Sequence, residues 1–221
     1  MITVSEVVET IIKRKPFIEG ALSEGLINLS SLGRQIKPEV EARLKKEVKE
    51  GAIVMALKRL APLLDIQMNI KIKNALSQFG DIIVRSNLAV YSFKNSDSLI
   101  QKQSKLLKHI SMRKEIFHTI SKGVFETTIV ISDMMDSELM DIFQHEELIS
   151  KTEKLSSITI KLPKENIKIS GLYYFIFKKI AWEGINILEV ISTTNEFTII
   201  LGDDDVDLAF SVLKNMNHSN L

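Results

Sequence analysis

The residues best suited to bind a small molecule lie in the last third of the chain, in a loop between a predicted strand and a predicted helix. The loop closes with Lys168, Ile169, Ser170, Gly171 and Leu172. At the first turn of a helix the backbone N–H groups lack intrahelical partners, and the positive end of the helix dipole favours an anion. The α-carboxylate of an amino acid suits this place. Gly171 has no side chain and would let a ligand or a neighbouring backbone approach closely.

A second candidate contact, Asn186, follows the same helix in the stretch Gly-Ile-Asn-Ile at 184–187. Its side-chain amide both donates and accepts hydrogen bonds, so it could bind the ammonium and the carboxylate of one amino acid together. Glycine and asparagine are also common at ordinary helix ends and turns. The residue types alone therefore leave open whether Gly171, Gly184 and Asn186 contact a ligand or only shape the backbone.

Residue patterns typical of catalysis or metal binding are missing. The sequence contains no cysteine, which excludes disulfides, thiolate metal sites and thiol nucleophiles. The phosphate-binding loop, the nucleophile elbow and the dinucleotide fingerprint are absent. The acidic run 203–205 suits the start of a helix better than a cation site. We therefore predict no metal, no cofactor and no enzymatic activity. The histidines also lack the spacing of metal ligands: His109, His118, His145 and His218.

Two further features bear on where the protein acts. The chain starts with an acidic, interrupted segment instead of a basic start and an apolar run, so no signal peptide is predicted. No window approaches 18 uncharged apolar residues, which excludes a predicted membrane-spanning helix. Together with the absence of cysteine, these features favour a cytoplasmic protein without a membrane partner.

The last two thirds of the chain repeat one order of elements, strand–helix–strand–strand–helix. This order predicts an α+β fold of two ferredoxin-like modules, each with its helices on one face of the sheet and one side of the sheet buried. The first unit comprises predicted segments at 81–93, 96–108, 115–121, 124–132 and 133–143; the second comprises 155–162, 171–183, 185–191, 197–201 and a helix from Asp203.

The first 75 residues are predicted to form short helices joined by tight turns. Apolar residues recur with helical spacing in the first helix, which we expect to start at Ser5. Because proline interrupts helices, Pro38 should separate two helices and Pro62 should mark the end of a third. The remaining stretch, 67–80, is predicted to be a polar linker. The expected helices are 4–12, 17–24, 29–36, 39–50 and 52–64.

This N-terminal region could bind nucleic acid as a helix-turn-helix domain, with 52–64 as the recognition helix and 82–93 as a β-wing. It holds 13 Lys and Arg against 9 Asp and Glu, a net charge of +4. Many of these bases stand four residues from an acid, as on an ordinary solvated helix, and 52–64 is largely apolar. A bundle for dimerisation or partner docking is therefore the other interpretation. The expected phosphate contacts are Arg34, Lys37, Arg43, Lys45, Lys46 and Lys49.

The second repeated unit resembles an ACT domain, in particular the C-terminal regulatory modules of aspartate kinases. The resemblance covers roughly 160–215, about a quarter of the chain. The first unit matches by element order alone, because Ser-Met-Arg-Lys at 111–114 replaces the Gly-Ile-Asn turn. The glycine-rich, lysine-bearing segment of the kinase is absent. The matching residues are Ser170-Gly171, 184–187, Ile191 to Glu196, and 203–205.

The predicted organisation is therefore a helical domain at 1–75, a degenerate ACT-like module at 80–150 and an ACT-like module at 151–221. The resemblance also implies a homodimeric, non-catalytic regulator that senses a small effector, most simply an amino acid, at a site shared between two modules packed side by side. Two alternatives stay open: a ligand-responsive DNA-binding transcription regulator, or a structural regulatory subunit of an amino-acid biosynthetic enzyme. The implied binding residues are Lys168, Ile169, Ser170, Gly171, Leu172 and Asn186.

Overall fold

The computed structural model describes residues 2–216, with Pro16, 65–71 and 73 described by their backbone only. The chain divides into two compact units, Met1–Asn74 and Ala75–Leu221. Each unit has its own buried core, and they are described separately below.

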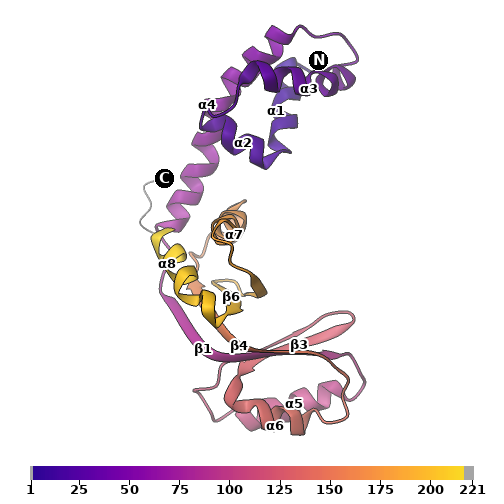
Figure 1. The fold of residues 1–221 in the computed structure, drawn as a ribbon, viewed down its shortest axis with the longest axis vertical. Helices are drawn as coiled ribbons and strands as arrows, with labels where there is room; N and C mark the ends of the chain where they lie inside the picture. Colours follow the sequence, from indigo (N-terminus) through magenta and orange to yellow (C-terminus); the bar gives the residue numbers. More distant parts are fainter. Residues whose placement is uncertain (1, 217–221) are drawn as a thin grey trace. The chain divides into compact units, whose positions relative to one another are not determined.

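The first unit is built from helices (Figure 1). Helix α1 starts at a capping box, in which the Thr3 hydroxyl accepts the Glu6 N–H and the Glu6 carboxylate accepts the Thr3 N–H. The expected start at Ser5 is therefore wrong by two residues, because Thr3 supplies the cap. The helices are α1 (Val4–Lys13), α2 (Pro16–Ser23), α3 (Leu29–Leu44) and α4 (Glu50–Leu76).

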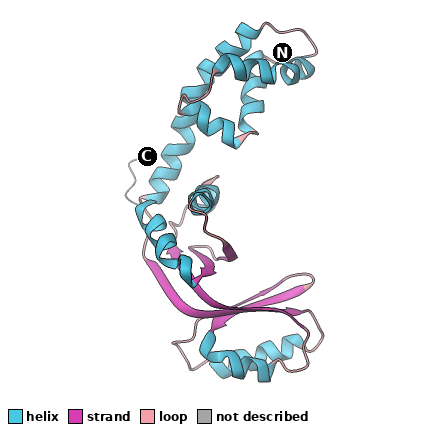
Figure 2. Ribbon diagram, viewed as in Figure 1, coloured by secondary structure: helices cyan, strands magenta, loops and turns pink. Residues whose placement is uncertain are grey.

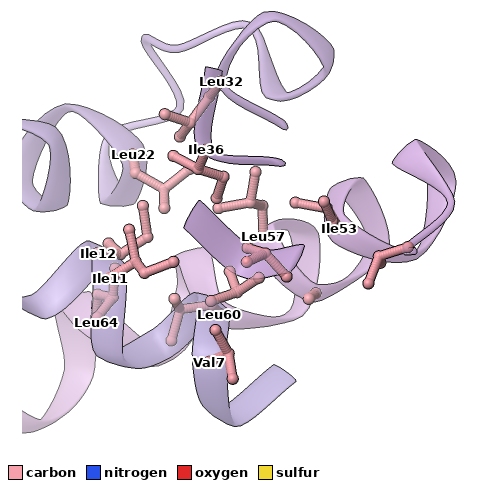
Figure 3. Packing of buried hydrophobic residues seen from close by; sticks show 14 residues of the cluster. Val7, Ile11, Ile12, Leu22, Leu32, Ile36, Ile53, Leu57, Leu60 and Leu64 are labelled. Carbon is pink, nitrogen blue, oxygen red and sulfur yellow. The ribbon is translucent and has the colours of Figure 1, made fainter. Parts of the chain in front are cut away.

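One apolar cluster holds these helices together (Figure 3). Val8 and Ile12 on α1 are fully buried, as are Ile53 and Leu57 on α4. The apolar stripe predicted for the first helix is thus the face that packs on its neighbours. Burial of such side chains contributes roughly 1.5–3 kcal/mol each.

Both expected helix breaks at proline are wrong. Helix α3 runs through Pro38 and α4 runs through Pro62. An internal proline removes a backbone hydrogen bond, but both prolines are exposed, while Ile36 and Val40 on either side of Pro38 are buried in the same cluster. Tertiary packing therefore outweighs the local cost. The predicted linker 67–80 is also wrong in part, because α4 continues as far as Leu76.

The second unit contains the two predicted strand–helix–strand–strand–helix repeats, which confirms the expected α+β fold class (Figure 2). The elements are β1 (Ile82–Lys94), α5 (Leu99–Ile110), β2 (His118–Lys122), β3 (Glu126–Ser132), α6 (Asp136–Ile142), β4 (Leu148–Lys161), α7 (Leu172–Trp182), β5 (Ile187–Ser192), β6 (Glu196–Gly202) and α8 (Val206–Met216), with short 3-10 turns at Asp133–Met135, Asn166–Lys168 and Asp203–Asp205.

The strands form one antiparallel sheet in the order β2-β3-β1-β4-β6-β5. The two long central strands serve both repeats. Residues 88–94 of β1 pair with β3, whereas 82–85 pair with the part of β4 that also pairs with β6. Strand β4 runs unbroken through residue 150, where a boundary between modules was predicted. The two repeats therefore share their central strands within one compact unit.

Both central strands are irregular at matching places. Asn87 in β1 and Lys154 in β4 adopt positive φ angles of 60° and 58°, and the pairing register shifts between Arg85 and Leu88. Bulges of this kind bend a strand and increase its twist. Each long strand thus changes direction where it passes from one repeat to the other.

Helices cover one face of the sheet in both repeats. In the first repeat, α5 and α6 pack on Tyr91 and Phe93 of β1. In the second, the ring of Tyr173 on α7 stacks on Phe197 of β6 at 5.1 Å. The opposite face is also buried at its centre, by a cluster not foreseen from the sequence, because the bent sheet brings both repeats together there. Its buried members are Leu88, Val90, Val130, Leu155 and Ile200.

A buried tyrosine links the sheet to α6. The Tyr91 hydroxyl donates a 2.7 Å hydrogen bond to Asp136, which also pairs with Lys151 at 2.9 Å. Burial and the adjacent carboxylate raise the pKa of Tyr91 far above its usual value. We expect Tyr91→Phe to lower the free energy of unfolding by about 1–2 kcal/mol, measured by urea denaturation. Tyr174→Phe, at an exposed position of α7, should change it by less than about 0.5 kcal/mol.

Candidate functional site

The segment leading into α7, which includes the predicted binding residues 164–172, is held against the turn between β5 and β6. The Leu162 N–H donates to the Asn195 carbonyl at 2.7 Å. Asn166 is buried, and its amide donates to the carbonyls of Pro163 at 2.8 Å and Thr194 at 2.7 Å. These contacts fix the loop before it reaches the first turn of α7.

Gly171 is the N-cap residue of α7, with φ of 87°. This left-handed conformation is costly for residues with a side chain, so the glycine is required by the backbone whatever else it does. No side chain caps the helix start. The N–H groups of the first turn are therefore available to an anion at a place where Ser170 is exposed.

The other predicted residues of this segment differ in exposure. Lys168 is exposed and Ile169 is half-buried, so both can face a ligand. Leu172 is 2% exposed and shares the buried side of α7 with Ile176 and Ile180. Helical periodicity thus places the Leu172 side chain in the core, and only its backbone can contribute to binding.

Asn186 is exposed and lies beyond the opposite end of α7. The helix has 11 residues and rises about 1.5 Å per residue, so its ends are about 16 Å apart. Ser170 and Asn186 of one module therefore do not meet. A site that uses both residues needs a second module alongside the first.

The surface next to Asn186 is an open sheet edge. Strand β5 is the last strand of the sheet, and its Leu188 and Val190 are 36% and 43% exposed. The Tyr173 hydroxyl lies 2.9 Å from the Ser192 hydroxyl, which ties α7 to this strand. An edge strand with one free side and exposed apolar residues can associate with another strand.

Three of the six expected nucleic-acid contacts in the first unit form ion pairs, and Lys49 is exposed. Arg34 pairs with Glu50 at 3.1 Å, and Arg43 pairs with Glu39 at 2.7 Å. Lys37 pairs with Glu41 at 3.6 Å, whereas Lys45 and Lys46 are exposed at the end of α3 without an ion pair among the described residues.

The expected β-wing is wrong, because residues 82–94 form the central strand β1 of the second unit. The predicted recognition helix, 52–64, lies inside the longer α4.

No group of three or more potential metal ligands occurs among the described residues. No helix within residues 2–216 has the length and apolarity needed to cross a bilayer.

Sequence reasoning did not foresee the structural role of two asparagines, which hold the loop after the first strand of each repeat. Asn166 and its counterpart in the first repeat, Asn95, both bind carbonyls of a neighbouring hairpin turn. The available signal was an asparagine shortly after the first strand of each repeat.

The second unit is a tandem of ferredoxin-like modules on one antiparallel sheet, the arrangement expected from the ACT resemblance. The sequence matches no protein-family model and no curated protein. Solved structures, in contrast, share the fold. The aspartate kinase of Clostridium acetobutylicum aligns with a TM-score of 0.52 at 17% identity, over 62% of this chain and 34% of that enzyme.

The regulatory subunit of aspartate kinase from Thermus thermophilus aligns with a TM-score of 0.50 at 12% identity, over 61% of this chain and 95% of that subunit. A structure of aspartokinase α and β subunits gives 0.51 at 14% identity, covering 63% and 99%. The chain spans a third of the Clostridium enzyme but nearly all of the regulatory subunit. The shared fold is therefore that of the regulatory part, as the resemblance predicted.

Proposed function

We propose that this chain is a non-catalytic regulatory protein that binds an amino acid at the start of α7. The observation that carries the proposal is the uncapped first turn of α7, entered through Gly171 in a left-handed conformation and flanked by the exposed Ser170. The effector's carboxylate would accept the free N–H groups there. Its ammonium would bind the Asn186 side-chain oxygen.

The site requires two copies of the chain. Since Ser170 and Asn186 lie at opposite ends of α7, the Asn186 of one copy would complete the loop of the other across paired β5 edges. Such an arrangement has two-fold symmetry and forms two equal sites per dimer. The exposed Leu188 and Val190 would be buried by the pairing.

The neighbours support a regulatory role. The Clostridium enzyme is described as allosteric, and the Thermus chain is a regulatory subunit. By analogy, the effector would bind one arrangement of this chain more tightly than another and so change a second activity. The coupling free energy of such an effect is typically about 1–3 kcal/mol. Because three of the six expected phosphate contacts are paired with acids and the expected β-wing is a central strand of the sheet, we do not extend the proposal to DNA.

The test is a thermal-shift panel of the purified protein with each common amino acid at millimolar concentration. A ligand present at a hundred times its dissociation constant stabilises the native state by about 2.7 kcal/mol. In a chain of this size, that should raise the melting temperature by about 5–10 °C. We expect one amino acid, or two related ones, to do so. A flat panel would contradict amino-acid sensing.

A further inference from the structure

The two repeats attach their first loop to the sheet in the same way. In the second repeat, the Asn166 amide donates to the Thr194 carbonyl. In the first, the Asn95 amide donates to the carbonyls of Gly123 at 2.9 Å and Val124 at 3.1 Å. Each acceptor lies in the turn of the repeat's own hairpin. The start of α5 in the first repeat is therefore the structural counterpart of the start of α7.

A carboxylate of the protein already lies at the start of α5. The hydroxyls of Ser96 and Ser98 each donate a 2.6 Å hydrogen bond to Glu146, one to each carboxylate oxygen. The Lys102 ammonium, one turn further along the helix, donates to the Gln144 carbonyl. The two hydroxyls, and secondarily Lys102, lower the pKa of Glu146. The group is thus held as an anion.

The backbone places Glu146 there. The segment follows α6 and turns at His145, whose φ is 70°. The Glu146 N–H donates to the Phe143 carbonyl at 3.0 Å, and the Lys94 N–H donates to the Glu147 carbonyl at 3.0 Å. This second bond joins the segment to the end of β1, immediately before the α5 loop.

The start of α7 has no such contact. Within the part of the chain that the structure describes, no side chain caps this helix start, and Lys168 and Ser170 are exposed. The two repeats thus share a loop architecture but differ in whether their own chain supplies an anion.

We propose that Glu146 is an internal carboxylate ligand that closes the first repeat to external effectors. The inference predicts that each chain binds one effector, at the second repeat alone. That part of it rests on the proposed function. The contact of Glu146 with Ser96 and Ser98 can be tested without any effector.

The experiment removes the carboxylate and returns it as acetate. Glu146→Ala should lower the melting temperature by about 2–6 °C, because two charge-assisted hydrogen bonds are lost. Acetate at about 100 mM should recover at least half of that loss, whereas sodium chloride at equal ionic strength should not.

Two variants serve as matched controls. Glu146→Gln keeps the size of the side chain and a hydrogen-bond acceptor, so acetate should add nothing beyond its effect on the wild type. Glu147→Ala removes the neighbouring carboxylate, which forms an exposed 2.9 Å pair with Lys94, and should show no acetate-specific recovery.

The proposal is overturned if acetate fails to stabilise Glu146→Ala more than the wild type, or stabilises all variants equally. If Glu146→Ala does not remain folded in buffer, its refolding yield in acetate compared with chloride answers the same question. A flat amino-acid panel would remove the proposed function but leave this acetate result intact. The two failures are therefore distinguishable.

Discussion

Chains carrying Gly171→Val and chains carrying Asn186→Ala are expected to regain effector binding when mixed, although neither variant binds alone. Valine at a φ of 87° is strained and would obstruct the start of α7. Alanine at 186 removes the proposed contact with the ammonium group. If each site combines the loop of one copy with the Asn186 of the other, a mixed dimer has one intact site and one doubly damaged site.

The expected amount of recovered binding is specific. Random exchange makes about half of the dimers mixed, each with one of two sites intact, so the mixture should bind about one quarter as much effector as the wild type. Isothermal titration calorimetry of the mixture after subunit exchange measures this stoichiometry, with the effector found in the thermal-shift panel as titrant.

The control is a mixture of Gly171→Val with a chain that carries both substitutions, which contains no intact site and should not bind. Absence of binding in the first mixture would show that one chain holds the whole site, contrary to the positions of Ser170 and Asn186. Binding by Asn186→Ala alone would remove that residue from the site.

The sequence was informative where local patterns decide the structure. Alternation and helical spacing predicted both repeats in the correct order, and the break expected between segments 115–121 and 124–132 lies between β2 and β3. Local preference failed at Pro38 and Pro62. Whether a helix continues through a proline depends on the core on either side of it, and a sequence window does not contain that information.

The candidate site was likewise predictable from the sequence only in part. The backbone role of Gly171 follows from its residue type and its place before a helix, and the structure has it there. The separation of Ser170 from Asn186 follows from the length of α7. The shared central strands and the contact of Glu146 with Ser96 and Ser98 join residues about 50 or more positions apart. No short sequence pattern predicts contacts between residues that lie so far apart in the chain.

The sharing of β1 and β4 leads to the second large expected effect, that of Phe93→Ala. Phe93 is 1% exposed and stacks on Phe143 with ring centroids 4.8 Å apart, in the core of the first repeat. We expect the substitution to lower the free energy of unfolding by about 3–5 kcal/mol. Phe125→Ala is the matched control. Because Phe125 is 84% exposed, this substitution should change the free energy of unfolding by less than about 0.5 kcal/mol.

The more informative result is where the loss of stability occurs. Amide hydrogen exchange should show that Phe93→Ala reduces protection in β6 as well as in β3. The two strands are not adjacent in the sheet, but each pairs with one of the two central strands, and those pair along most of their length. If the first repeat melts, β4 loses β1 as its partner. The second half of β4, which pairs with β6, is then no longer held on its other side. If β6 instead kept wild-type protection, the two repeats would unfold independently, and the predicted boundary at residue 150 would separate true domains.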